Sequence, residues 1–188
     1  FITTKLWEDD SRDPIGGFNK SLEKLGVDYV DLYLIHSPFE HWIEAWQSLT
    51  ELLKTNKLRA LGVSNFYLEH METLAKHSKI ITEVNQIRLN PYCYKNNNSI
   101  INYCLKKGIA VEAYSPLAKA KRFDSDIILG ISKKYHKTPA QIFIRWSLQH
   151  GFITIPKSKA RDRIIENIQV YDFNIEEPDM QILNNFQE

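Results

Sequence analysis

The chain has 188 residues, 43% of them hydrophobic and 12% aromatic, which is enough to bury one substantial globular core. Its formal net charge of +1 gives no electrostatic footprint for nucleic acid, and no window approaches the ~20 apolar residues of a membrane helix. The first residues lack the basic and apolar segments of a signal peptide. The two cysteines, Cys93 and Cys104, form neither a metal-type pair nor a disulfide framework, so we expect reduced thiols in a cytoplasmic protein without a metal site.

The hydrophobic pattern predicts strands and helices that alternate along the whole chain. Residues 1–5 are predicted to form the first strand, and residues 16–26 a helix that Gly26 closes. Further strands are expected over residues 29–36, 59–65, 82–87, 109–115 and 152–158. Further helices are expected over residues 43–57, 67–77, 98–108, 124–136, 139–151, 161–170 and 177–186. Strands that are each followed by helix predict a parallel sheet covered by helices.

Two architectures of this class compete. An open Rossmann-type sheet would carry a G-x-G-x-x-G motif, and neither that motif nor a P-loop occurs. We therefore favour an α/β fold of the (β/α)8 TIM-type barrel, represented by about six of its eight units. A complete barrel takes about 250 residues, and the chain starts with Phe1 instead of methionine, so we expect about two units upstream. Residues 1–188 are predicted to form a single, N-terminally incomplete barrel domain.

Polar side chains end the predicted strands, where parallel barrels place their chemistry. Lys5 and His36 end neighbouring strands, and such a pair suits carbonyl chemistry: the cation lowers the pKa of a neighbouring acid, and the histidine orients the substrate oxygen. The alternative is a surface lysine and a structurally satisfied histidine.

The next strand ends offer amide, hydroxyl and aromatic groups. Ser64, Asn65 and Gln86 could together hold a planar carboxamide such as that of nicotinamide. Tyr114 could stack on a flat heterocycle, although packing at the core or rim is the alternative.

The stretch IPKSKARDRIIEN has the pattern of an anion site. Lys157 and Ser158 are expected to end the last strand, and Arg163, Glu166 and Asn167 to share one face of the following helix. Two cations and a hydroxyl near a helix start fit a phosphate monoester, while the acidic and amide side chains could reach an adenine edge. The alternative is a charged helix start that is merely well solvated. The inward side of this helix is expected to carry Ile164, Ile165 and Ile168.

Several long motifs, in matching order, resemble the aldo-keto reductases, NADPH-dependent enzymes on a (β/α)8 barrel. The resemblance extends almost from end to end and is closest to the short-looped microbial and protozoan-type members. The motifs that carry it are FITTKLW, SLEKLGVDYVDLYLIHSP, GVSNF, VNQI, AYSPLA and IPKSKARDRIIENIQVYDF.

The resemblance implies roles for individual residues in the reduction of a small-molecule carbonyl by NADP(H). Lys5 and His36 match the catalytic lysine and histidine, and Trp7 matches an aromatic wall of the substrate pocket. The implied cofactor ligands are Ser64, Asn65 and Gln86 for the nicotinamide carboxamide, Tyr114 for the nicotinamide ring, Ser115 and Leu117 for the pyrophosphate, Lys157, Ser158 and Arg163 for the 2′-phosphate, and Glu166 and Asn167 for adenine.

The chain also departs from the family pattern. The family's proton-donating tyrosine and the aspartate that pairs with the lysine precede the strand that begins here. Arg88 and Asn90 stand where the family often has an acidic residue and a histidine, and they have no assigned role. A catalytically inactive NADP(H)-binding remnant, or a non-functional fragment, is therefore the alternative to a reductase. The full-length protein is expected to be a monomer without nucleic-acid or membrane partners.

Overall fold

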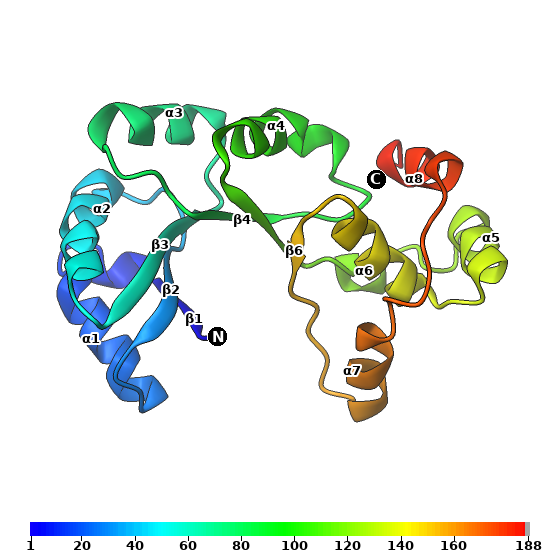
Figure 1. Ribbon diagram of the computed structural model, residues 1–188, viewed down its shortest axis with the longest axis horizontal. Helices are drawn as coiled ribbons and strands as arrows, with labels where there is room; N and C mark the ends of the chain where they lie inside the picture. Colours follow the sequence, from blue (N-terminus) through cyan, green and yellow to red (C-terminus); the bar gives the residue numbers. More distant parts are fainter. Residues whose placement is uncertain (187–188) are drawn as a thin grey trace. The chain divides into compact units, whose positions relative to one another are not determined.

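A computed structural model describes residues 1–186 of the chain (Figure 1). Its strands are β1 (Thr3–Leu6), β2 (Val30–Ile35), β3 (Leu58–Ser64), β4 (Val84–Arg88), β5 (Ala110–Tyr114) and β6 (Ile153–Thr154). Its α-helices are α1 (Pro14–Leu25), α2 (Trp42–Thr50), α3 (Leu68–His77), α4 (Asn98–Lys107), α5 (Asp126–Tyr135), α6 (Pro139–Gln149), α7 (Arg161–Ile168) and α8 (Glu177–Asn184). Short 3₁₀ helices cover Glu8–Asp10, Glu51–Lys54, Lys95–Asn97 and Ala118–Ala120.

The described chain divides into two compact units. The first comprises residues 1–87 with 102–110, and the second comprises residues 88–101 with the chain from 111 onward. In the first unit β1, β2, β3 and β4 pair side by side in chain order, and all three pairings between them are parallel. In the second unit β5 and β6 also pair in parallel. The predicted order of strands and helices is confirmed, and the prediction of a single domain stays a prediction.

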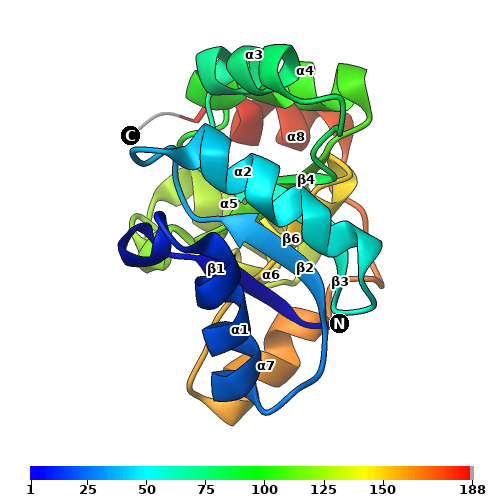
Figure 2. The same cartoon turned by 90° about the vertical axis from the view of Figure 1, so that its left-hand side faces the viewer.

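Strand β2 forms the centre of the first unit. All six of its residues are buried, as expected for a parallel strand that is covered on both faces. Helices α1 and α2 cover one face of β1, β2 and β3 (Figures 1 and 2), and they contribute the fully buried side chains of Phe18, Trp46 and Leu49. Neighbouring strands pack so closely on Gly62 in β3 that no side chain fits there. A Cβ at this position would lie 2.6 Å from Leu34 Cδ2 and 2.8 Å from the Val84 carbonyl oxygen.

Helix boundaries follow from local chemistry. Helix α1 begins at Pro14, and the Asp13 carboxylate accepts a hydrogen bond from Gly16 N at 2.9 Å. The same helix ends at Gly26, whose φ of 66° is the left-handed conformation predicted for this cap. The helix expected over residues 43–57 is shorter than predicted, because its second half tightens into the 3₁₀ helix Glu51–Lys54.

The end of the last predicted strand is wrong. Strand β6 covers only Ile153–Thr154, whereas the sequence pattern extended it to residue 158. Pro156 has no N–H to donate to a neighbouring strand, so ladder pairing cannot continue through it. Lys157 and Ser158 therefore lie in an irregular segment beyond the strand.

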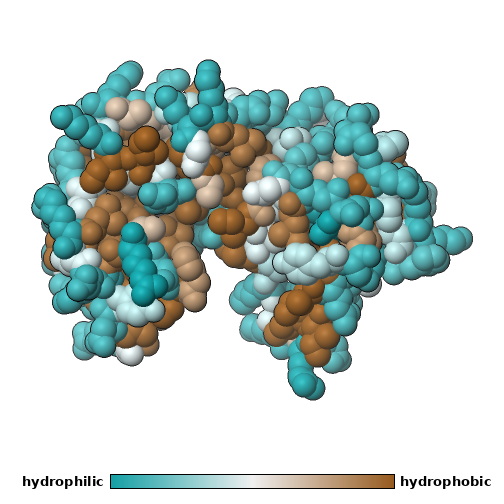
Figure 3. Space-filling model, viewed as in Figure 1, coloured by the Kyte–Doolittle hydropathy of each residue, from teal (hydrophilic) through white to brown (hydrophobic). Residues whose placement is uncertain are grey.

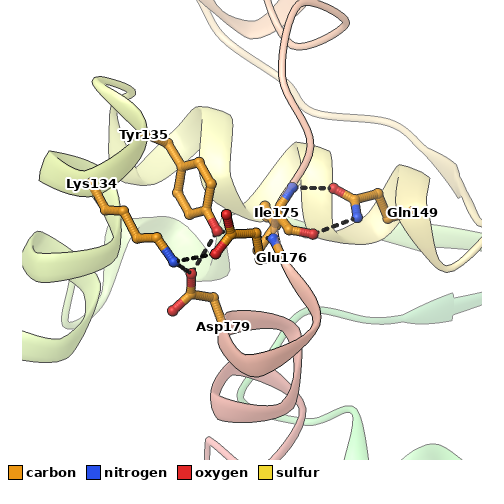
Figure 4. A network of polar contacts seen from close by, with 6 residues as sticks. All are labelled: Lys134, Tyr135, Gln149, Ile175, Glu176 and Asp179. Atoms are coloured by element: carbon orange, nitrogen blue, oxygen red, sulfur yellow. Dashed lines mark hydrogen bonds and ion pairs between the residues drawn. The ribbon is translucent and has the colours of Figure 1, made fainter.

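Hydrogen bonds and ion pairs hold helix α8 in the second unit. Asn184 Oδ1 accepts hydrogen bonds from Trp146 Nε1 at 2.7 Å and is 2.8 Å from His150 Nε2. Figure 4 shows the polar network, in which Lys134 and Tyr135 of α5 contact Asp179 of α8. The network includes Lys134 Nζ to Glu176 Oε2 at 2.6 Å, Glu176 N to Tyr135 Oη at 2.8 Å, Ile175 N to Gln149 Oε1 at 2.7 Å and Gln149 Nε2 to Ile175 O at 3.0 Å.

The expected inward side of helix α7 is wrong. Ile164, Ile165 and Ile168 are 46%, 45% and 66% exposed, and Figure 3 shows apolar residues gathered over this helix. The part of α7 that is buried is Asn167, at 8% exposure. Within residues 1–186, no helix combines the length and apolar character that a membrane span needs. The described residues also contain no group of three or more His, Cys, Asp or Glu side chains arranged to hold a metal ion.

Candidate functional site

The first unit brings Lys5 and His36 to the ends of adjacent strands. Lys5 is paired in register with Leu34, and His36 follows directly after β2, with its backbone N–H bonded to Leu6 O at 3.1 Å. Burial lowers the pKa of His36, and the positive charge of nearby Lys5 lowers it further. The imidazole is therefore neutral at pH 7, a state in which one ring nitrogen can donate a hydrogen bond to a carbonyl oxygen.

The Trp7 indole packs against this histidine. The ring centroids of Trp7 and His36 are 4.0 Å apart with an interplanar angle of 44°. Trp7 is nevertheless 56% exposed, so its remaining surface is available to a ligand. The three residues that the family resemblance assigned to catalysis and to the substrate wall are thus neighbours.

Asn65 ties three strand ends together. Its left-handed φ of 60° is one that asparagine tolerates, and it brings Asn65 N to 2.9 Å from Gln86 O and Asn65 Nδ2 to 3.0 Å from His36 O. Ser64 is paired in register with Gln86, and its hydroxyl donates to Gln86 O at 3.0 Å. The three predicted carboxamide ligands therefore form one hydrogen-bonded group that also holds the backbone of His36.

The second unit positions the residues that follow β5. Leu89 N donates to Tyr114 O at 3.2 Å, and the Asn90 amide donates to Ser115 O at 3.1 Å. Asn90 is 1% exposed, and its Oδ1 also accepts from Tyr92 N at 3.1 Å. The asparagine that had no assigned role therefore fixes the backbone of Ser115, which has a left-handed φ of 50°.

A cavity of about 440 Å³ in the second unit collects most of the predicted nucleotide ligands. Six of them line it: Leu117, Lys157, Ser158, Arg163, Glu166 and Asn167. A second cavity, of about 200 Å³, is lined by Ser115 together with Leu117 and Lys157. Tyr114 lines neither cavity. The helical face predicted for Arg163, Glu166 and Asn167 thus does face a common space.

The charges around the larger cavity suit a phosphorylated nucleotide. Lys119, Lys157 and Arg163 belong to its lining, and so does Ser158, which carries a hydroxyl. The single carboxylate of the lining, that of Glu166, accepts a hydrogen bond from Thr138 Oγ1 at 2.7 Å. The three cationic residues and the hydroxyl can bind a phosphate dianion. The Glu166 carboxylate can accept a hydrogen bond from another group of the same ligand.

Sequence reasoning missed several residues of this lining. Lys119 and Ala120 lie in a run of left-handed residues, with φ of 48° at Ala118, 56° at Lys119 and 60° at Ala120. No glycine or asparagine signals this turn. Thr138 and Pro139 also line the cavity. The Thr-Pro pair is recognisable in the sequence as a helix start, but its place in the cavity wall follows only from the tertiary structure.

Comparison with known proteins agrees with this geometry. The model of the aldo/keto reductase family matches residues 1–126. The glyoxal reductase of Bacillus subtilis (strain 168) is 42% identical over 183 residues, covering 96% of this chain and 66% of that protein. The methylglyoxal reductase DkgA of Yersinia pestis is 43% identical over 185 residues, with coverage of 96% and 66%. A Bombyx mori aldo-keto reductase, solved in complex with NADP, matches with a TM-score of 0.90 at 33% identity, covering 100% of this chain and 67% of that one.

The chain belongs to the aldo/keto reductase family. It spans about two thirds of the length of the curated relatives it matches. The predicted fold class, an α/β barrel of the (β/α)8 type represented by part of its units, is confirmed.

Proposed function

We propose that this chain carries the lysine, the histidine and the cofactor-binding residues of an NADPH-dependent reductase of small aldehydes and ketones. The observation that carries the proposal is the cavity of about 440 Å³, where Lys157, Ser158, Arg163 and Glu166 converge. A purely solvated helix start would not share one cavity with Lys119 and Thr138, which come from separate segments of the chain. Their chemistry fits the adenosine 2′-phosphate that distinguishes NADP from NAD.

The catalytic contribution is proposed for the first unit. NADPH, when bound, supplies the hydride for the carbonyl carbon. His36 is neutral at pH 7 and would orient the carbonyl oxygen by a hydrogen bond, and Lys5 would lower the pKa of the acid that protonates this oxygen. Trp7, whose exposed ring lies over His36, would form one wall of the substrate site. Ser64, Asn65 and Gln86 are proposed to hold the nicotinamide carboxamide, and Tyr114 to stack on its ring.

The substrate class is proposed from the relatives. Their names, glyoxal reductase and methylglyoxal reductase, point to small dicarbonyl compounds. We also propose that the two compact units belong to one barrel domain and that the protein acts as a cytoplasmic monomer.

Nucleotide binding is the first test. NADPH and NADH are titrated into the chain and binding is followed by the fluorescence of the reduced nicotinamide. We expect tighter binding of NADPH, and we expect Arg163→Met to weaken NADPH binding by about 10- to 100-fold, the value of a hydrogen bond between charged groups. Arg161→Met is the matched control, because Arg161 lies on the same helix and does not line the cavity. Equal effects of both variants would show that the cavity is not the site.

Turnover is the second test. Oxidation of NADPH by the full-length protein is measured with glyoxal and methylglyoxal as substrates, and Lys5→Met and His36→Gln are expected to abolish it. Binding of NADPH without oxidation, at any carbonyl concentration, would instead favour the NADP(H)-binding remnant.

A further inference from the structure

The start of helix α6 is built into the wall of the nucleotide cavity. Thr138, Pro139 and Ala140 line the cavity together with Glu166 and Asn167 of α7. Thr138 is the residue that caps α6: its side chain accepts the Gln141 N–H at 3.3 Å. The same hydroxyl donates to Glu166 Oε1 at 2.7 Å.

These two bonds fix the direction of the Thr138 hydroxyl. An oxygen that accepts the helix N–H can send its single proton only toward the remaining acceptor, which is the Glu166 carboxylate. Because the donor is part of a helix cap, it cannot rotate away without losing the cap. The carboxylate is therefore held in one orientation by a group that is itself held in place.

Gln141 fixes the backbone beneath this carboxylate. Gln141 is 6% exposed. Its Oε1 accepts a hydrogen bond from Thr138 N at 3.0 Å, and its Nε2 donates to Glu166 O at 3.2 Å and to Gln169 O at 2.9 Å. The capping box of α6 thus holds both the main chain and the side chain of Glu166.

We propose that Thr138 is a positioning residue that sets the selection of the purine base through Glu166. This inference rests on the proposed function and on the adenine contact that the family resemblance implies for Glu166. Glu166 lines the cavity and its Oε1 is bonded to Thr138, so Oε2 would be the carboxylate oxygen that accepts a hydrogen bond from the base. Such an acceptor bonds the exocyclic amino group of adenine, and it repels the carbonyl oxygen that hypoxanthine carries at the same position.

The test compares two ligands that differ only in that group: NADPH and its hypoxanthine analogue, reduced nicotinamide hypoxanthine dinucleotide phosphate. Dissociation constants are measured by fluorescence for the wild-type chain and for Thr138→Val, which keeps the β-branched shape and removes the hydroxyl. We expect the wild type to prefer NADPH, and Thr138→Val to reduce that preference by about tenfold, mainly by weakening NADPH binding.

Two control variants separate positioning from helix stability. Thr138→Ser keeps the hydroxyl and should therefore keep the wild-type preference for NADPH over the hypoxanthine analogue. Ser125→Ala removes the side-chain cap of α5, where Ser125 Oγ accepts Ile128 N at 3.4 Å, and Ser125 does not line the cavity. It should lower the melting temperature without changing the ratio of the two dissociation constants.

Glu166→Gln tests the same inference if Thr138→Val does not fold. Glu166→Gln should itself reduce the preference for NADPH over the hypoxanthine analogue. Equal weakening of both ligands by Thr138→Val, or an unchanged preference in Glu166→Gln, would overturn the inference while leaving the proposed function intact. A wild-type chain that binds neither ligand would overturn the proposed function and this inference together.

Discussion

Substitution of Tyr135 by phenylalanine tests how helix α8 is held against α5. The Tyr135 hydroxyl donates to Asp179 Oδ2 at 2.5 Å and accepts the Glu176 N–H at 2.8 Å (Figure 4). A hydrogen bond to a charged group contributes about 1.5–3 kcal/mol, and Asp179 keeps its contact with Lys134 after the change. We therefore expect Tyr135→Phe to lower the free energy of unfolding by about 2 kcal/mol. For a chain of this size, that loss corresponds to about 4–8 °C in melting temperature.

The assay is thermal and urea unfolding followed by tryptophan fluorescence and circular dichroism. Tyr171→Phe is the matched control, because Tyr171 is 73% exposed and loses the same hydroxyl to solvent. If the two variants unfold at the same temperature, the hydroxyl of Tyr135 does not hold α8, and the reasoning is refuted.

The loss of stability in Tyr135→Phe should also depend on pH. Burial alone would raise the pKa of Asp179, but hydrogen bonds from Lys134 and Tyr135 outweigh it and hold the pKa below its ordinary value of 3.8. A carboxyl whose pKa is lowered by folding stabilises the protein above its unfolded pKa, and this contribution is lost as the pH falls through the folded pKa. The stability difference between the wild type and Tyr135→Phe should therefore shrink as the pH is lowered from about 5 to about 2.

Three further predictions concern other parts of the fold. Gly62→Ala should lower the free energy of unfolding by about 1–3 kcal/mol because its Cβ would clash with a neighbouring strand. Gly130→Ala, whose Cβ would meet open space on α5, should raise the free energy of unfolding by up to about 1 kcal/mol. Thermal unfolding of the two variants must therefore show melting-temperature shifts of opposite sign. The Ile2 N–H lowers the pKa of Asp31, so Asp31→Asn should destabilise the chain at pH 7 and approach wild-type stability on acidification; a constant difference would contradict this. Ile168→Lys should reduce light scattering on concentration without a change in melting temperature, because Ile168 is 66% exposed.

The sequence predicted elements well where the cause is local. The Gly26 cap and the Thr138-Pro139 helix start depend on a few neighbouring residues, and both lie where the pattern placed them. The end of β6 was missed because the apolar residues before Pro156 extended the strand pattern toward Ser158, while the missing proline N–H decides the pairing.

The candidate site could be predicted only in part. Arg163, Glu166 and Asn167 share a helix face by simple periodicity, and they do line one cavity. Periodicity could not say that Ile164 and Ile168 would be exposed, because that depends on which elements pack against α7. Nor could it reveal that a helix cap bonds the Glu166 carboxylate, since this contact joins residues 28 apart in the chain.

The left-handed run through Ala118, Lys119 and Ala120 stores conformational energy in the cavity wall. Each L-residue in that conformation costs about 1–2 kcal/mol, so the run holds about 3–6 kcal/mol that packing must offset, and Ala118 is 2% exposed. Glycine at these positions would relieve the strain but would also let the backbone sample other shapes when the cavity is empty. Side chains at these positions leave the backbone fewer alternative conformations than glycine would, so a ligand bound in this cavity would have less ordering entropy to offset.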